Sequence, residues 1–222
     1  MPGMELHQVL RRRRMVRDFH PDRPVPPDVL ARVLDAARRG PSAGFSQGTD
    51  LLVLTAAEDR DRWWAATVPN RNDPGVVPDR WLRGVTTAPC LVVLLAHPGA
   101  YLDRYAEADK GHTDRDPSAW PVPWWDVDTG MAALLVLLTA VDEGLGGLLF
   151  GVPGSRADHV RKAFGIPSDR RLVGVVALGY AVPRPPSGSA RRRRRPLEEV
   201  VHDGRFGVPW TGSGASSGSG ES

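Results

Sequence analysis

Hydrophobic residues along the chain recur either at helical spacing or in short continuous runs. Helical spacing, with apolar residues three or four positions apart, follows Asp28, and Gly40-Pro41 ends it. The apolar residues of this stretch are Val29, Leu30, Val33, Leu34 and Ala37. Further helices are predicted over Leu6–Met15, Glu58–Ala66, Asp128–Glu143 and Ala157–Phe164.

Continuous apolar runs predict the strands. Ala88–Ala96 and Leu172–Gly179 are apolar without alternation, which is typical of strands buried on both faces, and Leu51–Leu54 is a shorter run of the same kind. Helices interleaved with three or four strands predict an α/β or α+β fold. Residues 181–190 resemble a linker, and the Gly- and Ser-rich residues 208–222 are expected to be a disordered tail.

The helix predicted over Asp128–Glu143 is apolar nearly all round, so it should be buried by its own domain or by a partner subunit. Its longest apolar run, Met131–Val141, is shorter than the roughly 18 residues that span a bilayer. Met1–Leu10 has no apolar core of a signal peptide. We therefore expect a cytoplasmic protein without a membrane partner.

The net charge is only +3, but the arginines are clustered. One cluster is Arg11–Arg14 with Arg17, and the other is Arg191–Arg195. Neither lies in a nucleic-acid-binding motif with interleaved aromatic residues, so we expect no nucleic acid. A solvated face stays an alternative. A bound anion is favoured, because guanidinium groups pair bidentately with phosphate.

Two glycine motifs have alternative interpretations. Gly44–Gly48 matches G-x-S-x-G, which would make Ser46 a hydrolase nucleophile, but that motif needs a strand before the serine and a helix after it. Gly144–Gly147 resembles a dinucleotide fingerprint, yet it follows a helix rather than a strand. It is either a helix C-cap or a place where main-chain amides approach a flat ligand.

Other candidate residues do not form a convincing acid–base or metal site. The single cysteine, Cys90, lies in an apolar run, so we expect it to be a small buried hydrophobic residue. The six histidines lack metal-ligand spacing, so no metal is expected. Four carboxylates are interpreted as solvated loop residues and helix caps: Asp114, Asp116, Asp126 and Asp128. Three tryptophans are either an aromatic wall over a planar substrate or ordinary core residues: Trp120, Trp124 and Trp125.

Four segments together, in order, resemble motifs of the nitroreductase family. The resemblance extends over residues 8–207. The segments are the arginine stretch Arg13–Phe19, the loop Pro41–Gln47, the apolar helix with its glycines Asp128–Gly147, and the closing stretch Arg192–Val201.

This resemblance implies an α+β fold with a central, mostly antiparallel sheet flanked by helices. It implies one flavin-mononucleotide (FMN)-binding domain over residues 1–207 and an intertwined homodimer with FMN at each of two subunit interfaces. The implied reaction is ping-pong hydride transfer from NAD(P)H through the flavin to a small acceptor such as a nitroaromatic or a quinone. The flavin carries this chemistry, so no catalytic side chain is implied.

The same resemblance assigns residues to the site. The FMN phosphate and ribityl chain would be held by Arg13, Arg14, Met15, Arg17, Arg192 and Arg194. The flavin would be lined from the other subunit by Pro41, Ser42, Ala43 and Phe45. Main-chain amides of Leu145 and Gly146 would face the flavin N5 and O4 atoms.

The chain departs from the family pattern at several positions. Met15 stands where serine is frequent, which removes a hydroxyl contact to the phosphate, and Phe45 stands where asparagine is usual. Gly48-Thr49 replaces a Pro-Trp pair. Other chemistries on this fold stay open: flavin fragmentation of the dimethylbenzimidazole synthase type, dehalogenation, dehydrogenation, and deazaflavin-dependent reduction.

Overall fold

The computed structural model describes residues 3–69, 78–111, 114–184 and 192–210. The chain divides into two compact units, Met1–Pro183 and Arg184–Ser222. Within the predicted linker, residues 185–190 lie outside the described residues, as do residues 211–222 of the predicted tail. The assignment of residues 1–207 to one domain stays a prediction.

The first unit is built on a four-stranded sheet in the order β1-β2-β4-β3, and every neighbouring pair is antiparallel. The strands β2 and β4 are therefore central, whereas β1 and β3 form the edges. The bounds are Thr49–Leu54 for β1, Cys90–Ala96 for β2, Gly146–Phe150 for β3 and Arg171–Gly179 for β4.

The continuous apolar sequence of β2 follows from the two cores that this strand separates. Leu91 and Val93 point into one hydrophobic core, and Val92 and Leu94 point into the other. All seven residues of β2 are buried. Because both faces are covered, alternation of polar and apolar residues is absent, even though the sheet is antiparallel.

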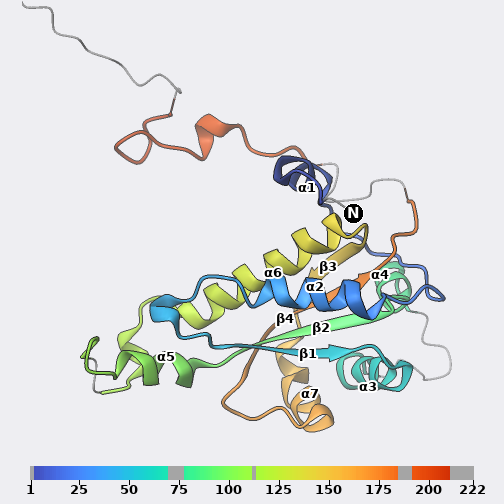
Figure 1. Ribbon diagram of the computed structural model, residues 1–222, viewed down its shortest axis with the longest axis horizontal. Coiled ribbons are helices and arrows are strands. Elements are labelled where there is room, and N and C mark those ends of the chain that lie inside the picture. The colour runs from blue at the N-terminus through green and yellow to red at the C-terminus, as the bar shows by residue number, and fades with distance from the viewer. Residues whose placement is uncertain (1–2, 70–77, 112–113, 185–191, 211–222) are drawn as a thin grey trace, which may run out of the picture. The chain divides into compact units, whose positions relative to one another are not determined.

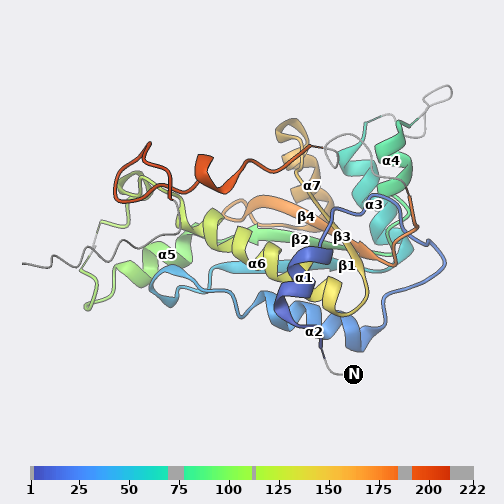
Figure 2. The same ribbon diagram turned by 90° about the horizontal axis from the view of Figure 1, so that it is seen from above.

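Helices cover both faces of this sheet (Figure 1). The helices α2 (Pro27–Ala37) and α6 (Trp124–Asp142) pack on one face, and Figure 2 shows α6 lying over the strands. The helices α3 (Ala57–Thr67) and α7 (Ala157–Phe164) pack on the other face. The fold is therefore α+β with an antiparallel sheet flanked by helices, as predicted.

The N-terminal helix is shorter than its sequence pattern indicates. Instead of Leu6–Met15, α1 covers Leu6–Arg12. Met15 forms a parallel bridge with Gly147 at the outer edge of β3, and the Val16 N–H donates to the Gly147 carbonyl at 3.0 Å. Pairing with the sheet edge satisfies backbone groups there, and this tertiary contact overrides the local helical preference.

Two helices of the structure were not predicted from the sequence. α4 covers Arg80–Val85 and α5 covers Pro98–Tyr105. The proline at the first position of α5 suits a helix start, because the backbone N–H that proline lacks would have no partner within the helix there. α6 begins at Trp124 rather than Asp128, so residues 101–125, for which the sequence predicted no element, contain the end of α5 and the start of α6. Three short 3-10 turns complete the unit: η1 (Ala43–Phe45), η2 (Pro117–Ala119) and η3 (Gly154–Arg156).

By length and composition, α6 is the one helix of the described residues that could cross a membrane. Core helices of water-soluble folds meet the same criterion. α6 buries Val136 and Leu137 in the core beneath it and packs against α2 and the sheet, so here it is a core helix.

The second unit has little regular structure among its described residues. It contains the 3-10 turn η5 (Leu197–Glu199), beside which Arg195 pairs with Glu199 at 3.0 Å, and a bridge between His202 and Pro209. Its apolar side chains are largely exposed, and Phe206 reaches 93%. The exposed apolar residues are Leu197, Val200, Phe206, Val208 and Trp210.

Replacing the fully buried Leu94 of β2 by alanine should lower the free energy of unfolding by about 2–5 kcal/mol, because the substitution leaves a cavity in the core under α2 and α6. Urea denaturation measures the change. Leu6→Ala is the control: this side chain is 65% exposed, and its removal should cost no more than about 0.5 kcal/mol. Equal losses in the two variants would contradict the described core.

Candidate functional site

The arginine cluster begins where α1 ends. Arg13 is the C-cap of this helix, and its side chain is partly buried. Its Nη1 atom is buried without a hydrogen-bond partner among the described residues. A buried guanidinium nitrogen without a partner is costly, and an anionic acceptor would satisfy it. The first site feature is thus a buried guanidinium nitrogen that lacks an acceptor.

The neighbouring arginines add uncompensated positive charge. Arg14 is exposed, and Arg17 is partly buried with its Nη1 atom 3.5 Å from the Met15 carbonyl oxygen. Across the described part of the chain, no carboxylate pairs with Arg13, Arg14 or Arg17. Arg32 shows the contrast, since its guanidinium donates to both carboxylate oxygens of Glu143, at 2.6 and 2.8 Å. The cluster therefore suits a bound anion.

The glycine segment lies directly against this cluster. Gly144 ends α6 with φ +74°, the left-handed conformation that glycine adopts without penalty. A Cβ on Gly146 would lie 2.7 Å from Val16 Cγ2, so only glycine allows the arginine segment to approach β3 this closely. The structure thus brings together two segments that the sequence places more than a hundred residues apart.

The main-chain amides of this segment are not equally available. The Leu145 N–H donates to the Ala140 carbonyl at 2.7 Å as part of the helix end. This amide is therefore occupied within the chain, and the ligand-facing role of Leu145 stays a prediction. The Leu145 side chain is buried in the core. Of Leu145 and Gly146, the amide of Gly146 is therefore the better candidate for contact with a ligand.

The loop from Pro41 to Gln47 is compact and conformationally unusual. Gly44, Phe45 and Gln47 all have positive φ, at +62°, +58° and +51°. Side chains hold the backbone in place: Ala43 N–H donates to Asp128 Oδ2 at 2.8 Å, and Arg104 Nε donates to the Gly44 carbonyl at 2.8 Å. Phe45 is 74% exposed.

Ser46 lies in this same loop, and its surroundings do not support a hydrolase. Its hydroxyl donates to the Ala43 carbonyl at 2.6 Å, and no described histidine hydrogen-bonds to it. α2 precedes the loop and β1 follows it, which is the reverse of the strand–serine–helix order of a nucleophile elbow. The hydrolase interpretation loses its geometric basis.

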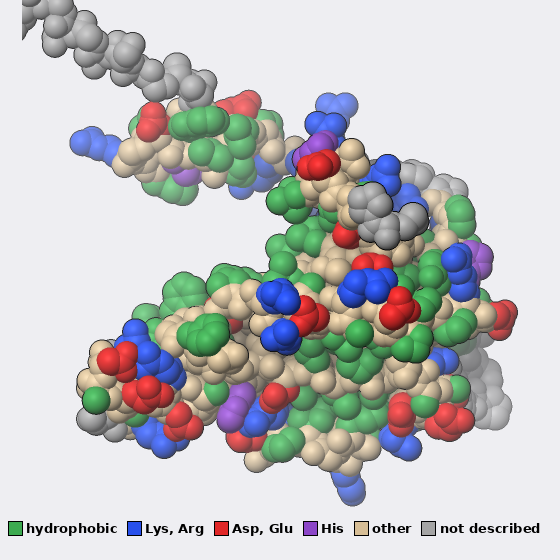
Figure 3. All heavy atoms as spheres, in the orientation of Figure 1, with side chains coloured by type: hydrophobic (Ala, Val, Ile, Leu, Met, Phe, Trp, Pro, Cys, Tyr) green, Lys and Arg blue, Asp and Glu red, His purple; other side chains and the backbone are tan. Residues whose placement is uncertain are grey.

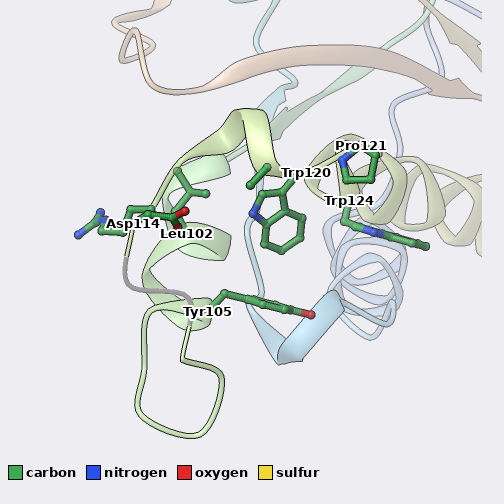
Figure 4. A pocket seen from close by; sticks show the side chains of 8 residues that line it. Leu102, Tyr105, Asp114, Trp120, Pro121 and Trp124 are labelled. Atoms are coloured by element: carbon green, nitrogen blue, oxygen red, sulfur yellow. The ribbon is translucent and has the colours of Figure 1, made fainter.

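The three tryptophans separate into two roles. Trp120 and Trp124 line a pocket of about 210 Å³ together with Leu102 and Tyr105 (Figure 4). The rings of Trp120 and Tyr105 meet edge to face with centroids 4.7 Å apart. Trp125, in contrast, is only 7% exposed and packs in the core against Tyr101. Of the two alternatives left open for the tryptophans, Trp125 therefore fits the core residue, and its contact with a substrate stays a prediction.

Two other kinds of chemistry find no support in the described residues. No group of three or more histidine, cysteine or carboxylate side chains there could hold a metal ion. Cys90 is fully buried in β2, and burial raises the pKa of its thiol to about 12, so the thiol stays protonated and unreactive.

The comparisons with known proteins agree with this geometry. Residues 10–180 match the model of the nitroreductase family. The chain is 27% identical over 185 residues to a protein of Methanothermobacter thermautotrophicus named as an NADH dehydrogenase/NAD(P)H nitroreductase, covering 82% of this chain and 80% of that protein. It is also 27% identical over 220 residues to an NADH dehydrogenase of Thermus thermophilus, covering 90% and 97%.

Among solved structures, one described as a nitroreductase in complex with FMN from Exiguobacterium sibiricum superposes with a TM-score of 0.69 at 17% identity. The match covers 90% of this chain and 98% of that one. At this identity the likeness concerns the fold. The chain belongs to the nitroreductase family of oxidoreductases, which confirms the family and the fold class predicted from the sequence.

Replacing Gly146 by alanine should lower the free energy of unfolding by about 1–3 kcal/mol, because the new methyl group would force the Val16 segment away from β3. Thermal unfolding measures this loss. Gly151→Ala is a matched control, since a Cβ there meets nothing within 4 Å and φ is not positive; it should be neutral or slightly stabilising. An equally tolerated Gly146→Ala would argue against the close approach.

Proposed function

We propose that this chain binds FMN and transfers electrons from NAD(P)H to a small acceptor. The single observation that carries the proposal is the buried, unpartnered Nη1 of Arg13, inside the segment that matches the family. A phosphate would supply the missing acceptor. The relatives named above support the same function, because one is described with FMN and another is named for NAD(P)H.

The described residues fit the phosphate end of FMN. Arg13 and Arg17 would donate to the phosphate oxygens, and the exposed Arg14 would add charge at the rim. Met15 offers only its backbone there, because its side chain has no hydroxyl group. Arg192 and Arg194 lie in the second unit, and their role in phosphate binding is proposed from the family resemblance alone.

The ring end of FMN would be met by backbone and by apolar surface. The Gly146 N–H would donate to the ring edge, where it stabilises negative charge in the reduced form. Bound FMN would supply the redox chemistry, hydride transfer from NAD(P)H and reduction of a second substrate, in the ping-pong order expected from the sequence. The protein positions the ring and excludes water, so no acid–base pair is required.

One chain does not bring together all the residues of the proposed site. The Ala43 N–H donates a hydrogen bond to Asp128 near the start of α6, whereas Gly144 follows the end of this helix. The rise along the helix axis from Asp128 to Gly144 is about 24 Å, so the loop holding Ser42 and Phe45 lies far from Arg13 and Gly146 (Figure 1). A second copy of the chain would bring its own loop to the flavin, as the family resemblance implies.

The outer face of α6 offers a surface for that second copy. Its solvent-facing apolar side chains repeat with alternating spacings of three and four, a pattern typical of helix pairing. Met131 is 36% exposed and Leu134 is 49% exposed, and Figure 3 shows hydrophobic side chains gathered over α6. The stripe consists of Trp124, Val127, Met131, Leu134 and Leu138.

We further propose that the pocket lined by Trp120 and Trp124 accepts the planar electron acceptor. Tyr105 lines this pocket, and a Cβ on Gly44 would lie 2.7 Å from the Tyr105 ring, so the pocket adjoins the loop that carries Phe45. Aromatic walls suit flat apolar substrates such as quinones and nitroaromatics.

The purified protein tests the proposal directly. We expect visible flavin absorption bands, either as isolated or after loading with FMN and desalting, and oxidation of NADH or NADPH on addition of a quinone. A colourless protein that cannot retain FMN would refute the proposed function. Separate assays with the two nicotinamides identify the donor.

Arg13→Ala should raise the dissociation constant of FMN by about 10- to 100-fold, because charge-assisted hydrogen bonds contribute about 1.5–3 kcal/mol. Arg194→Ala should act in the same direction if the second unit completes the site. Flavin fluorescence titration measures both. The matched control is Arg11→Ala, which removes an exposed arginine of α1 and should leave FMN affinity within about twofold. Unchanged affinity in both Arg13→Ala and Arg194→Ala would remove the phosphate assignment.

Leu134→Glu should raise the dissociation constant of the proposed homodimer by about 30-fold or more, because it places a charge in the middle of an apolar helix face. Analytical ultracentrifugation over a dilution series measures the change. Ala65→Glu, at an exposed position of α3 on the opposite layer, is the control and should leave the assembly unaltered. A monomeric wild type, or a variant that associates as wild type does, would contradict the interface.

A further inference from the structure

Asp128 is a buried carboxylate that the proposed chemistry does not use. It lies in the first turns of α6 and is 5% exposed. Its Oδ2 atom accepts two hydrogen bonds, one from the Tyr101 hydroxyl and one from the Ala43 N–H, both at 2.8 Å. A buried carboxylate needs such donors, so its place is determined by two different elements, α5 and the loop before β1.

Tyr101 makes this arrangement rigid. Its side chain is fully buried, and burial together with the nearby Asp128 carboxylate raises the pKa of its phenol, so the hydroxyl remains a donor. Its ring also packs directly under the loop: a Cβ on Gly48 would lie 2.5 Å from Tyr101 Cε2. Tyr101 therefore contacts the loop at its Gly48 end. Its hydroxyl also orients the Asp128 carboxylate, which binds the Ala43 end of the same loop.

The loop needs external support, because its backbone is strained. Phe45 and Gln47 have positive φ without being glycine. Strain of this kind persists only where surrounding contacts determine the conformation. In this strained conformation the Phe45 side chain is 74% exposed to solvent. An exposed aromatic ring held on a strained backbone is therefore a candidate for contact with a ligand or partner.

We infer that Asp128, oriented by Tyr101, is a positioning residue that holds the loop of residues 42–47 in the form that presents Phe45 to the flavin of the partner subunit. The inference rests on the proposed function for its last step, the flavin contact. The first step, control of the loop, concerns this chain alone and is measurable without FMN.

Hydrogen exchange of the FMN-free protein tests the first step. Asp128→Asn should increase exchange of the 42–47 amides about tenfold, because a neutral amide binds the Ala43 N–H more weakly than a carboxylate does. Tyr101→Phe should increase it less, since the Asp128–Ala43 bond remains. Thr67→Val is the matched control: it removes a buried hydroxyl that donates to the Trp63 carbonyl on α3, away from the loop.

FMN binding tests the second step. Asp128→Asn should raise the FMN dissociation constant about tenfold and alter the visible circular dichroism of bound flavin, whereas Thr67→Val should change neither. If Asp128 had only a structural role, Asp128→Asn and Thr67→Val would both lower thermal stability. Neither variant would then change the FMN dissociation constant or the circular dichroism of bound flavin. Tyr101→Phe serves as the second variant if Asp128→Asn does not fold.

The outcomes separate the two proposals. Exchange at residues 42–47 that is no faster in Asp128→Asn and Tyr101→Phe than in Thr67→Val overturns the positioning role. Faster exchange with unaltered FMN affinity and flavin spectrum overturns the flavin contact. A wild-type protein that never binds FMN refutes the proposed function and the flavin contact with it, while the exchange result still decides whether Asp128 controls the loop.

Discussion

The site depends on one close approach, between the backbone after α1 and the glycine edge of β3. Val16 lies where a Cβ on Gly146 would otherwise be, and its N–H donates to the Gly147 carbonyl. This contact ends the first helix early and leaves the Arg13 guanidinium partly buried without an acceptor. A cation in that position is unfavourable by itself and becomes favourable when an anion binds. We propose that this packing at Gly146 and Gly147 prepares the phosphate site.

α6 connects the two ends of the proposed active site. One face carries residues such as Val136 into the core, and the opposite face leaves Leu134 exposed in an apolar stripe. Its first turns hold the loop before β1 through Asp128, and its last turn leads into the glycine segment. Because the helix separates these two features, the proposed function would require association of two copies to complete the site.

The proposed site uses arginines, backbone amides and apolar surface rather than acid–base side chains. This composition suits a cofactor that carries its own redox chemistry, because the protein then contributes position, charge and exclusion of water. Met15 and Phe45 make the surroundings less polar than in the family pattern. We expect this difference to bear on the acceptor and on flavin potential rather than on phosphate binding.

The sequence by itself determined the elements with a clear apolar pattern, such as the continuous apolar run of β2 and the helices α2 and α7, and it determined the family through motifs in order. It could not show that Met15 would leave a helical pattern, that the Leu145 amide would be occupied, or that Trp125 would be core. It assigned Asp128 to solvation or helix capping, whereas the structure buries this carboxylate beneath a loop. The physical reason is common to these cases. Periodicity reports local spacing, but which donor meets which acceptor, and which ring is buried, depends on segments distant in sequence that only packing brings into contact.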